Sequence, residues 1–235
     1  MEPREAIRRS DEASGGGVGA LVIRRSRLPC NPGHLSPPSR SLDQRLNAGS
    51  ESYDEDADRM QIVHVIRSLD PRYGGPPRVV TRLAAAHAGL GHQVTVVSTE
   101  LDAERSSLAR SALEEVPGSE RLAQVTIPEK TVTPLGSLRR GGRERMPSGD
   151  LVYLYGVWDP PLRAAARVAH ARGVPYVIRP AGMLTPWSLR HRRWKKRLAL
   201  AAGWKRMLDQ SLYVHALNRD HAQTMAPGRL PAPIA

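Results

Sequence analysis

Two adjacent glycines, Gly74 and Gly75, stand where a ligand could approach the chain. They follow an apolar run at 62–66 and precede a segment with helical periodicity. Because glycine has no Cβ atom, a ligand can come close to its backbone, and the helix start behind the pair offers free N–H groups and a positive dipole end. The pair therefore indicates a site for a diphosphate or for sugar hydroxyls. The alternative is a tight turn that needs glycine for its dihedral angles, and the pair alone favours that turn.

A second group of polar and aromatic residues, Tyr155, Gly156, Trp158 and Asp159, ends the apolar run at 151–155. A tryptophan ring could form the floor of a sugar site, because a pyranose has an apolar face, although a tryptophan at a loop start more often covers the core. Asp159 is the candidate catalytic residue, since its carboxylate could act as a base toward an acceptor hydroxyl. The favoured alternative for Asp159 is capping of the next helix across Pro160.

A third group follows the apolar run at 175–178 and begins with Arg179. An arginine at the carboxyl end of a strand points into the crevice beside the sheet and suits the binding of phosphate or carboxylate. A surface salt bridge explains Arg179 equally well. Gly182 lies three residues further on, in the same loop.

The elements that must position these groups read as strands alternating with helices. The helix after the glycine pair is expected to carry one apolar face and to end at Gly91, before a strand at 94–97. The residues of that face are Val80, Leu83, Ala84, His87 and Leu90. A strand, a helix and a second strand of this length are typical of a parallel crossover unit.

The rest of the chain repeats this alternation less regularly. We expect, in order, a helix at 103–115, a strand at 125–127, a surface loop at 136–147, a helix at 162–172, a basic helix at 188–207 and a strand at 212–216. The pattern predicts an α/β fold with an open, mainly parallel sheet and helices on both faces. In such sheets ligands bind beyond the carboxyl ends of the strands, where all three groups would lie.

Residues 1–59 show no sustained period and are rich in glycine, proline and, near their end, acidic residues. A segment of this composition cannot bury enough apolar area to offset its ordering entropy. We expect a disordered extension, or residues upstream of a true start at Met60; a functional tail is the alternative. The domain is expected at 60–225, followed by a frayed tail at 226–235.

The chain is strongly basic, with a formal net charge of +12, and no acidic residue occurs between Thr185 and Leu208. Such a segment attracts phosphates, nucleic acid or an acidic membrane surface. In the basic helix, Trp194 and Leu198 fall at helical spacing, and the cations considered for a membrane or anion contact are Arg193, Lys196 and Arg197. An ordinary amphipathic helix with a solvated cationic face is the favoured interpretation, and a face that rests on anionic lipid headgroups is the alternative.

Several classes of site lack their sequence signals. The single cysteine, Cys30, cannot form a disulfide within the chain, and the eight histidines show no spacing typical of a metal site, so we expect neither a metal nor a cofactor. No apolar run approaches the length of a transmembrane helix. We expect a cytoplasmic protein, with peripheral contact to the inner face of the membrane as an option.

Residues 60–225 resemble the N-terminal domain of the GT-B glycosyltransferases of family 4, also called group 1. Four features carry the resemblance: the Gly-Gly loop, the Gly91-His92-x-Val step, the Gly156-x-Trp158 turn and the Arg-Pro-Ala-Gly-Met-Leu-x-Pro-Trp block from Arg179. Each is weak alone, but their order and spacing are fairly specific.

The resemblance implies two Rossmann-like domains that face each other across a cleft. The N-terminal domain mainly receives the acceptor, the C-terminal domain holds the nucleotide-sugar, and transfer retains the anomeric configuration and typically needs no metal. By this resemblance Gly74 and Gly75 would approach the donor phosphates and the transferred sugar. Arg179 and Gly182 would line the acceptor cleft, which takes a saccharide or a lipid-linked acceptor, as in polysaccharide biosynthesis.

Two departures from the family pattern are visible. Tyr155 stands where many relatives carry a histidine, and the C-terminal domain with its paired-glutamate motif has no counterpart after Met225. We therefore expect a fragment, a truncated gene product or half of a split enzyme, with little activity alone and with a C-terminal partner domain on another polypeptide. The main alternative is a non-enzymatic basic module for anionic lipid or nucleic acid, and a small-ligand binding protein is a third class. Nucleic acid is disfavoured, because charge alone does not explain the glycine, proline and tryptophan at strand ends.

Overall fold

The computed structural model describes residues 21–24, 59–99 and 102–218. The predicted extension at 1–59 lies almost wholly outside these ranges, as does the predicted tail at 226–235. Within the extension the backbone of Leu21–Arg24 forms a strand, β1, to which the sequence pattern assigned no element.

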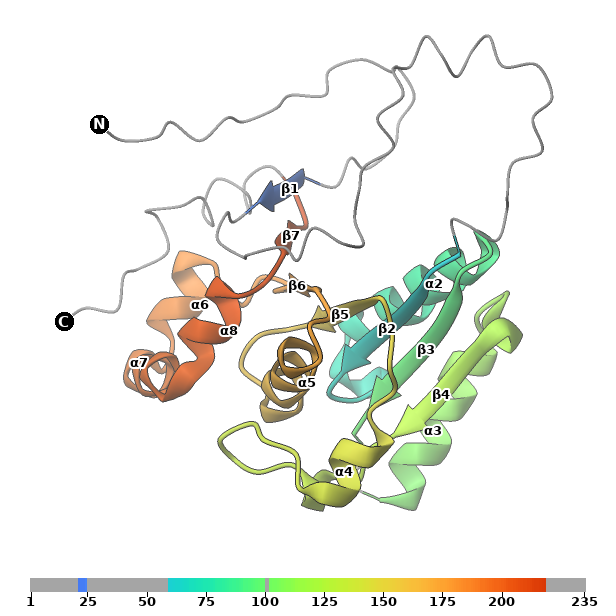
Figure 1. Cartoon of the computed structure of the whole chain (residues 1–235), viewed down its shortest axis with the longest axis horizontal. Helices are drawn as coiled ribbons and strands as arrows, with labels where there is room; N and C mark the ends of the chain where they lie inside the picture. Colours follow the sequence, from blue (N-terminus) through green and yellow to red (C-terminus); the bar gives the residue numbers. More distant parts are fainter. Residues whose placement is uncertain (1–20, 25–58, 100–101, 219–235) are drawn as a thin grey trace, which may run out of the picture.

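A seven-stranded sheet organises the chain, in the order β1-β7-β6-β5-β2-β3-β4 (Figure 1). The six strands from β2 to β7 are parallel, and β1 pairs antiparallel with β7. Those six follow the order of a doubly wound, Rossmann-like sheet. The predicted α/β class is confirmed. The strands after β1 are β2 (Gln61–Ile66), β3 (Gln93–Ser98), β4 (Leu122–Thr126), β5 (Leu151–Tyr155), β6 (Tyr176–Arg179) and β7 (Tyr213–Ala216).

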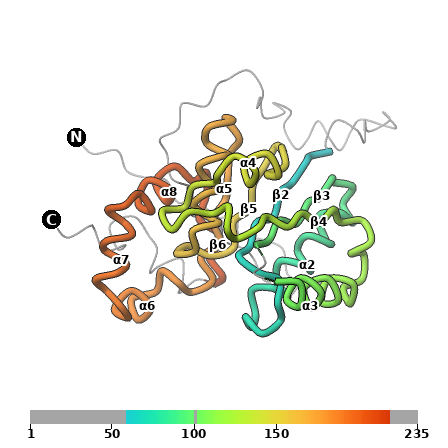
Figure 2. Tube along the Cα trace, turned by 90° about the horizontal axis from the view of Figure 1, so that it is seen from below, coloured from blue at the N-terminus to red at the C-terminus, as the bar shows by residue number. Residues whose placement is uncertain are grey.

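Helices cover both faces of the sheet. The helices α2 (Gly75–Gly89) and α3 (Ala103–Glu114) contribute to the core on one face, and α5 (Pro160–Ala171) and α8 (Lys205–Asp209) contribute to the core on the other (Figure 2). Val63 and Val65 of β2 face the α5 side, whereas Ile66 faces the α2 side, so the strand is buried on both faces as parallel strands usually are. The shorter elements are η1 (Pro71–Tyr73), η2 (Ser119–Arg121), η3 (Glu129–Thr131), α4 (Arg140–Arg145), α6 (Pro186–Arg190), α7 (Arg193–Ala199) and the π-helical η4 (Leu200–Trp204).

The predicted apolar face of α2 is correct except at its end. Val80 and Ala84 are fully buried, but Leu90 is 74% exposed. The helix ends at Gly89, and Gly91 adopts a φ of 91°, so the chain turns toward β3 just after Leu90. Leu90 therefore does not belong to the buried face.

The surface loop predicted at 136–147 is wrong in part. This stretch contains α4, and Met146 at its end is buried. Gly142 packs so closely that a Cβ atom there would lie 2.4 Å from the hydroxyl oxygen of Thr131. Gly142 thus permits close packing, where the composition alone had indicated a surface loop.

The single basic helix predicted at 188–207 is also wrong. Arg192 has a φ of 51° between α6 and α7, and Gly203 has a φ of 112° inside η4, so the segment changes direction twice. Trp194 and Leu198 are exposed, whereas Trp204 is buried. The predicted apolar stripe is therefore not continuous. Its first part, on α7, faces solvent, and its last part, from Trp204, faces the core.

Candidate functional site

The carboxyl edge of the sheet has its switch point between β2 and β5. The chain leaves β2 toward β3 on one side and leaves β5 toward β6 on the other, and open α/β sheets bind ligands at such a point. The three groups singled out in the sequence follow β2, β5 and β6, which are parallel, so the structure brings them to one edge. Their roles in binding or catalysis stay predictions.

An arginine that the sequence pattern did not single out joins two of these loops. Arg67 follows β2 directly, and its Nη1 donates to Oδ1 of Asp159 over 3.1 Å. Its Nη2 lies 3.7 Å from the carboxylate of Glu129. Burial opposes the charge on Arg67, but the hydrogen bond and charge of Asp159 outweigh it and raise the pKa of the guanidinium. The available signal was the position of Arg67 after a strand, which matches that of Arg179.

Asp159 does not cap α5 as the favoured interpretation proposed. It occupies the N-cap position, but its side chain makes no capping hydrogen bond; only its backbone carbonyl accepts, from the N–H groups of Leu162 and Arg163. The carboxylate is instead held by Arg67 and is 22% exposed. An ionised carboxylate in this position can accept a hydrogen bond from a hydroxyl group on a ligand.

The sequence left two interpretations of the glycine pair open, a tight turn and a ligand site, and one applies to each glycine. Gly74 has a φ of 86°, so this position needs glycine for its turn, whereas Gly75 shows no such requirement. A Cβ atom at either position would meet no protein atom within 4 Å, and both residues are exposed. Because Pro76 and Pro77 have no N–H, the first turn of α2 offers fewer donors than the sequence pattern suggested. The open space suits close approach of a ligand.

Asp70, another acid near this edge, stabilises the turn before Gly74. It is buried, accepts from the backbone N–H of Arg72, and receives two hydrogen bonds of 3.0 and 2.9 Å from Nε of the same residue. The hydrogen bonds from Arg72 lower the pKa of Asp70. This pair holds the turn that leads to Gly74.

Tyr155 points away from the edge and into the α2 face. Its hydroxyl lies 2.8 Å from Nδ1 of His64, whose Nε2 lies 3.1 Å from Nδ1 of His87. Burial, followed by the charge of His87, lowers the pKa of His64 to about 3, so this ring is neutral near neutral pH. Tyr155 itself is 4% exposed and offers little surface to a ligand. His64 had no signal in the sequence beyond its place in a strand.

Arg179 stands beside Tyr155 in the register of β5 and β6. It is half-buried, and within 59–99 and 102–218 no carboxylate lies within salt-bridge distance of it, so the surface salt bridge considered for it is not formed there. Its charge opposes the rise that burial causes in the pKa of Tyr155. A half-buried guanidinium without a carboxylate partner is suited to an anionic ligand.

Trp158 joins the β5 loop to the β6 loop. Its Nε1 donates to the carbonyl oxygen of Met183 over 3.3 Å, and the ammonium of Lys196 lies 5.6 Å from the centre of its ring. Lys196 also donates to the carbonyl oxygen and the hydroxyl of Ser188. Lys196, predicted as part of a membrane or anion contact, therefore faces the loops of the site, whereas Arg193 and Arg197 are exposed. Gly182, with a φ of 81°, makes the turn that carries Met183.

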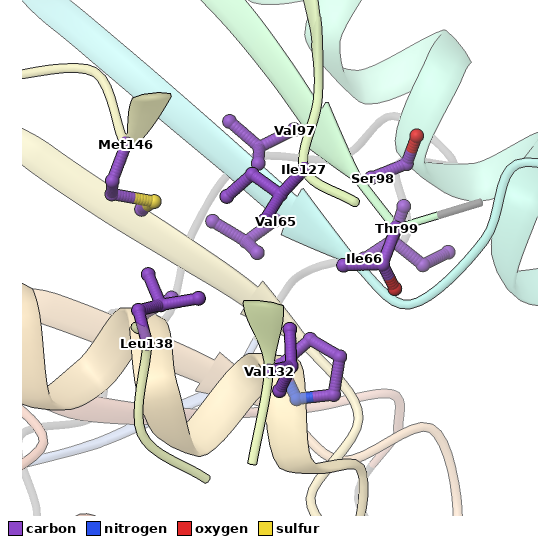
Figure 3. A pocket seen from close by; sticks show the side chains of 11 residues that line it. Val65, Ile66, Val97, Ser98, Thr99, Ile127, Val132, Leu138 and Met146 are labelled. Atoms are coloured by element: carbon purple, nitrogen blue, oxygen red, sulfur yellow. The ribbon is translucent and has the colours of Figure 1, made fainter. Parts of the chain in front are cut away.

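A small pocket lies at the same edge on the α5 face of the sheet (Figure 3). Its lining is mostly apolar, with Val65, Val97 and Ile127 among its residues, and it also contains the hydroxyl-bearing Ser98 and Thr99 but no charged side chain. The charged side chains lie at the polar edge beside it, which is therefore the candidate site. Among the described residues no group of three or more histidine, cysteine or acidic side chains could hold a metal ion. None of the helices in the described ranges has the length and apolarity needed to cross a membrane.

Comparison with known proteins shows the family to which this chain belongs. A family model described as "Glycosyl transferase 4-like domain" matches residues 74–233, which is more than half of the chain. No curated protein sequence matches it. One similar solved structure is a "putative UDP-N-acetylglucosamine 2-epimerase from Listeria monocytogenes", with 14% identity over 61% of this chain and 38% of that chain and a TM-score of 0.38. A similarity of this size is too low to support an argument about function.

Proposed function

Because the chain belongs to the glycosyl transferase 4-like family, we propose that it provides the acceptor-binding, N-terminal half of a GT-B glycosyltransferase. The reaction transfers a sugar from a nucleotide-sugar to a saccharide or lipid-linked acceptor with retention of configuration. The observation that carries the proposal is the Arg67–Asp159 pair at the switch point of the sheet, with Gly75 and Arg179 on the same edge.

Each group at this edge has a part in the proposal. Asp159 accepts a hydrogen bond from the acceptor hydroxyl and so orients its oxygen, and Arg67 is a positioning residue that fixes the carboxylate. Arg179, with the turn at Gly182, lines the acceptor side. The backbone at Gly75 allows the diphosphate and the transferred sugar to approach. Orienting the two reactants in this way supplies part of the rate enhancement, because it removes translational and rotational freedom before the reaction.

Charge develops on the departing diphosphate during transfer, and no resident metal is needed if fixed donors stabilise it. The proposal assigns this to the N–H of Gly75, together with donors from a second domain. Neither the leaving group nor the acceptor then requires a cofactor.

A two-domain enzyme needs a donor-binding half, and residues 59–99 and 102–218 build one Rossmann-like sheet. We propose that transfer also needs a second, donor-binding GT-B domain and that residues 1–235 turn over little sugar by themselves. The proposed location is the cytoplasm, at the inner face of the membrane, where nucleotide-sugars and lipid-linked acceptors meet.

The test is a transfer assay with the purified chain, a panel of labelled nucleotide-sugars and a panel of saccharide acceptors. The assay is run with the chain alone and with polypeptides that co-purify with it. The proposal predicts negligible transfer by the chain alone and transfer in the reconstituted mixture, lost in the Asp159→Asn variant. Robust transfer by the chain alone would refute the half-enzyme proposal, and full activity of Asp159→Asn would refute the role of the Arg67–Asp159 pair.

A further inference from the structure

The outer surface of α6 and α7 exposes three large apolar side chains. Trp187 is 80% exposed, Trp194 is 66% exposed and Leu198 is 64% exposed. We call these three residues the tryptophan face. Tryptophan is usually well buried, and large exposed apolar groups that occur together mark interaction sites.

The geometry of α7 directs two of these side chains away from the protein. Trp194 and Leu198 are four residues apart and lie on the same side of the helix. The opposite side carries Lys196, bonded to Ser188, and the partly buried Leu200. Leu200 packs against the core before the turn at Gly203, and Trp204 is buried beyond it. The turns at Arg192 and Gly203 thus place Trp194 and Leu198 on the surface and Trp204 in the core.

Cations flank the tryptophan face on both sides. Arg193 and Arg197 lie along one edge of Trp194 and Leu198 on α7, and Lys195 lies along the other, with its ammonium 5.3 Å from the centre of the Trp194 ring. Arg190 adds a further exposed cation at the end of α6. Among the described residues none of these four has a carboxylate within 4 Å, and the sequence has no acid from 185 to 208.

The position of the face leaves it accessible. Figures 1 and 2 both place α6 and α7 at the end of the molecule remote from α3 and β4. Its link to the candidate site runs through Lys196, which contacts Ser188 and lies above Trp158. Because Trp194 and Leu198 lie on the opposite side of α7 from Lys196, a surface bound there would be separated from the edge that carries Asp159 by the width of α7.

We propose that the tryptophan face binds an anionic lipid bilayer. Indole rings favour the boundary between headgroups and acyl chains, because one end of the ring is apolar and the N–H is polar. Long basic side chains beside them reach the phosphates while their methylene stems remain in the apolar layer. The combination of exposed indoles with uncompensated cations is complementary to an anionic lipid surface, and it is not explained by either an apolar partner or a purely acidic one.

The proposal stands on the surface of α6 and α7 and does not depend on sugar transfer. If the proposed function also holds, the bilayer would hold a lipid-linked acceptor beside the edge of the sheet. The two can fail separately, since vesicle binding is measured without any nucleotide-sugar.

The experiment measures binding of the full chain to sedimented vesicles of phosphatidylcholine alone and of phosphatidylcholine with about one third phosphatidylglycerol. We expect binding to the anionic vesicles at least about tenfold tighter, with a blue shift of tryptophan fluorescence and weakening at high salt, because exposed charges are screened. Equal binding to both vesicle types, or no binding to either, would overturn the proposal.

Two double variants separate the contributions. Arg193→Glu with Arg197→Glu should lower affinity for anionic vesicles at least about tenfold. Trp194→Ser with Leu198→Ser should weaken binding and reduce the fluorescence shift, leaving the part that Trp187 contributes. The matched control is Arg82→Glu with Arg110→Glu, exposed cations on α2 and α3, which should bind nearly as the wild type does. Circular dichroism confirms that each variant is folded; a folded charge-reversal variant with unchanged affinity would contradict the proposal.

Discussion

Nη1 of Arg67 donates to the carboxylate of Asp159 over 3.1 Å, across 92 positions of sequence. The bond joins the loops that follow β2 and β5 at the point where the direction of winding changes. The same bond holds the carboxylate of Asp159 at the edge of the sheet, and this side chain makes no capping hydrogen bond to α5.

The first prediction concerns the strength of the pair. Both side chains are partly exposed, 41% for Arg67 and 22% for Asp159, so solvent screening keeps their coupling small, at about 0.5–1 kcal/mol. A double-mutant cycle with Arg67→Met and Asp159→Asn, read by urea unfolding, measures it. The control is the exposed pair Arg140 and Glu144, for which we expect about 0.3–0.5 kcal/mol. A coupling of several kcal/mol would mean that the pair serves the fold more than the site.

The second prediction separates the two glycines. Gly74→Ala should destabilise the fold by about 1–2 kcal/mol, because its φ of 86° is costly for a residue with a Cβ atom. Gly75→Ala should leave stability unchanged or raise it slightly, since the position lies at the start of α2 and the added Cβ meets no protein atom within 4 Å. The same variant should weaken nucleotide-sugar binding in the reconstituted enzyme. Unchanged binding by Gly75→Ala would show that no ligand approaches there.

The third prediction is a loss of stability in mild acid. Folded His64 takes up a proton only near pH 3, whereas in the unfolded chain it does so near pH 6.5. Between these values the unfolded state binds more protons, so stability falls as pH is lowered, by about 1.4 kcal/mol per pH unit. The lowered pKa of His87 acts in the same direction. Urea unfolding of the wild type should therefore show a loss of about 2 kcal/mol between pH 7 and pH 5.

The wild type is compared with the double variant His64→Phe and Tyr155→Phe, in which both partners of the buried hydrogen bond are removed. We expect a shallower dependence of stability on pH in this variant, whatever its absolute stability. An unchanged slope would show that other groups account for the acid sensitivity.

The fourth prediction concerns the turn that divides the basic segment. Gly203→Ala should destabilise the fold by about 2 kcal/mol or more, because φ is 112° and the new Cβ would lie 2.2 Å from Nη2 of Arg163. That guanidinium donates to the carbonyl oxygen of Ala202 and lies 4.8 Å from the centre of the Trp204 ring, so it has limited freedom to move. Gly173→Ala, at a φ of 71° with no atom within 4 Å, is the control and should cost about 1 kcal/mol. Thermal unfolding compares the two; equal losses would argue against close packing at Gly203.

Local pattern predicted the sheet better than it predicted the site. The strand at 151–155 coincides with β5, because an uninterrupted apolar run between turn residues has few other interpretations. The helix at 103–115 and the strand at 125–127 are confirmed with shifted ends. The sequence pattern missed the break of the basic helix at Arg192. The backbone there has a positive φ, and the presence of an arginine does not indicate such a conformation.

The contacts of the site depend on pairs that are distant in sequence. The partner of Asp159 is 92 residues away, and the orientation of Tyr155 is set by His64 on another strand. The capping interpretation of Asp159 followed from its neighbours alone, and only the register of β2 with β5 shows that Arg67 can reach it. Such pairing follows from the order of the strands in the sheet, and the local pattern of a single sequence does not reveal that order.

The most direct test of the acceptor-side account is mapping of amide shifts in the labelled chain during titration with hexose oligosaccharides and nucleotide-sugars. The account predicts that the perturbed amides gather at Arg67, Gly75, Asp159 and Gly182, and that Asp159→Asn reduces the shifts. Perturbations gathered instead along β4 and α3, or their absence with every member of the panel, would contradict it.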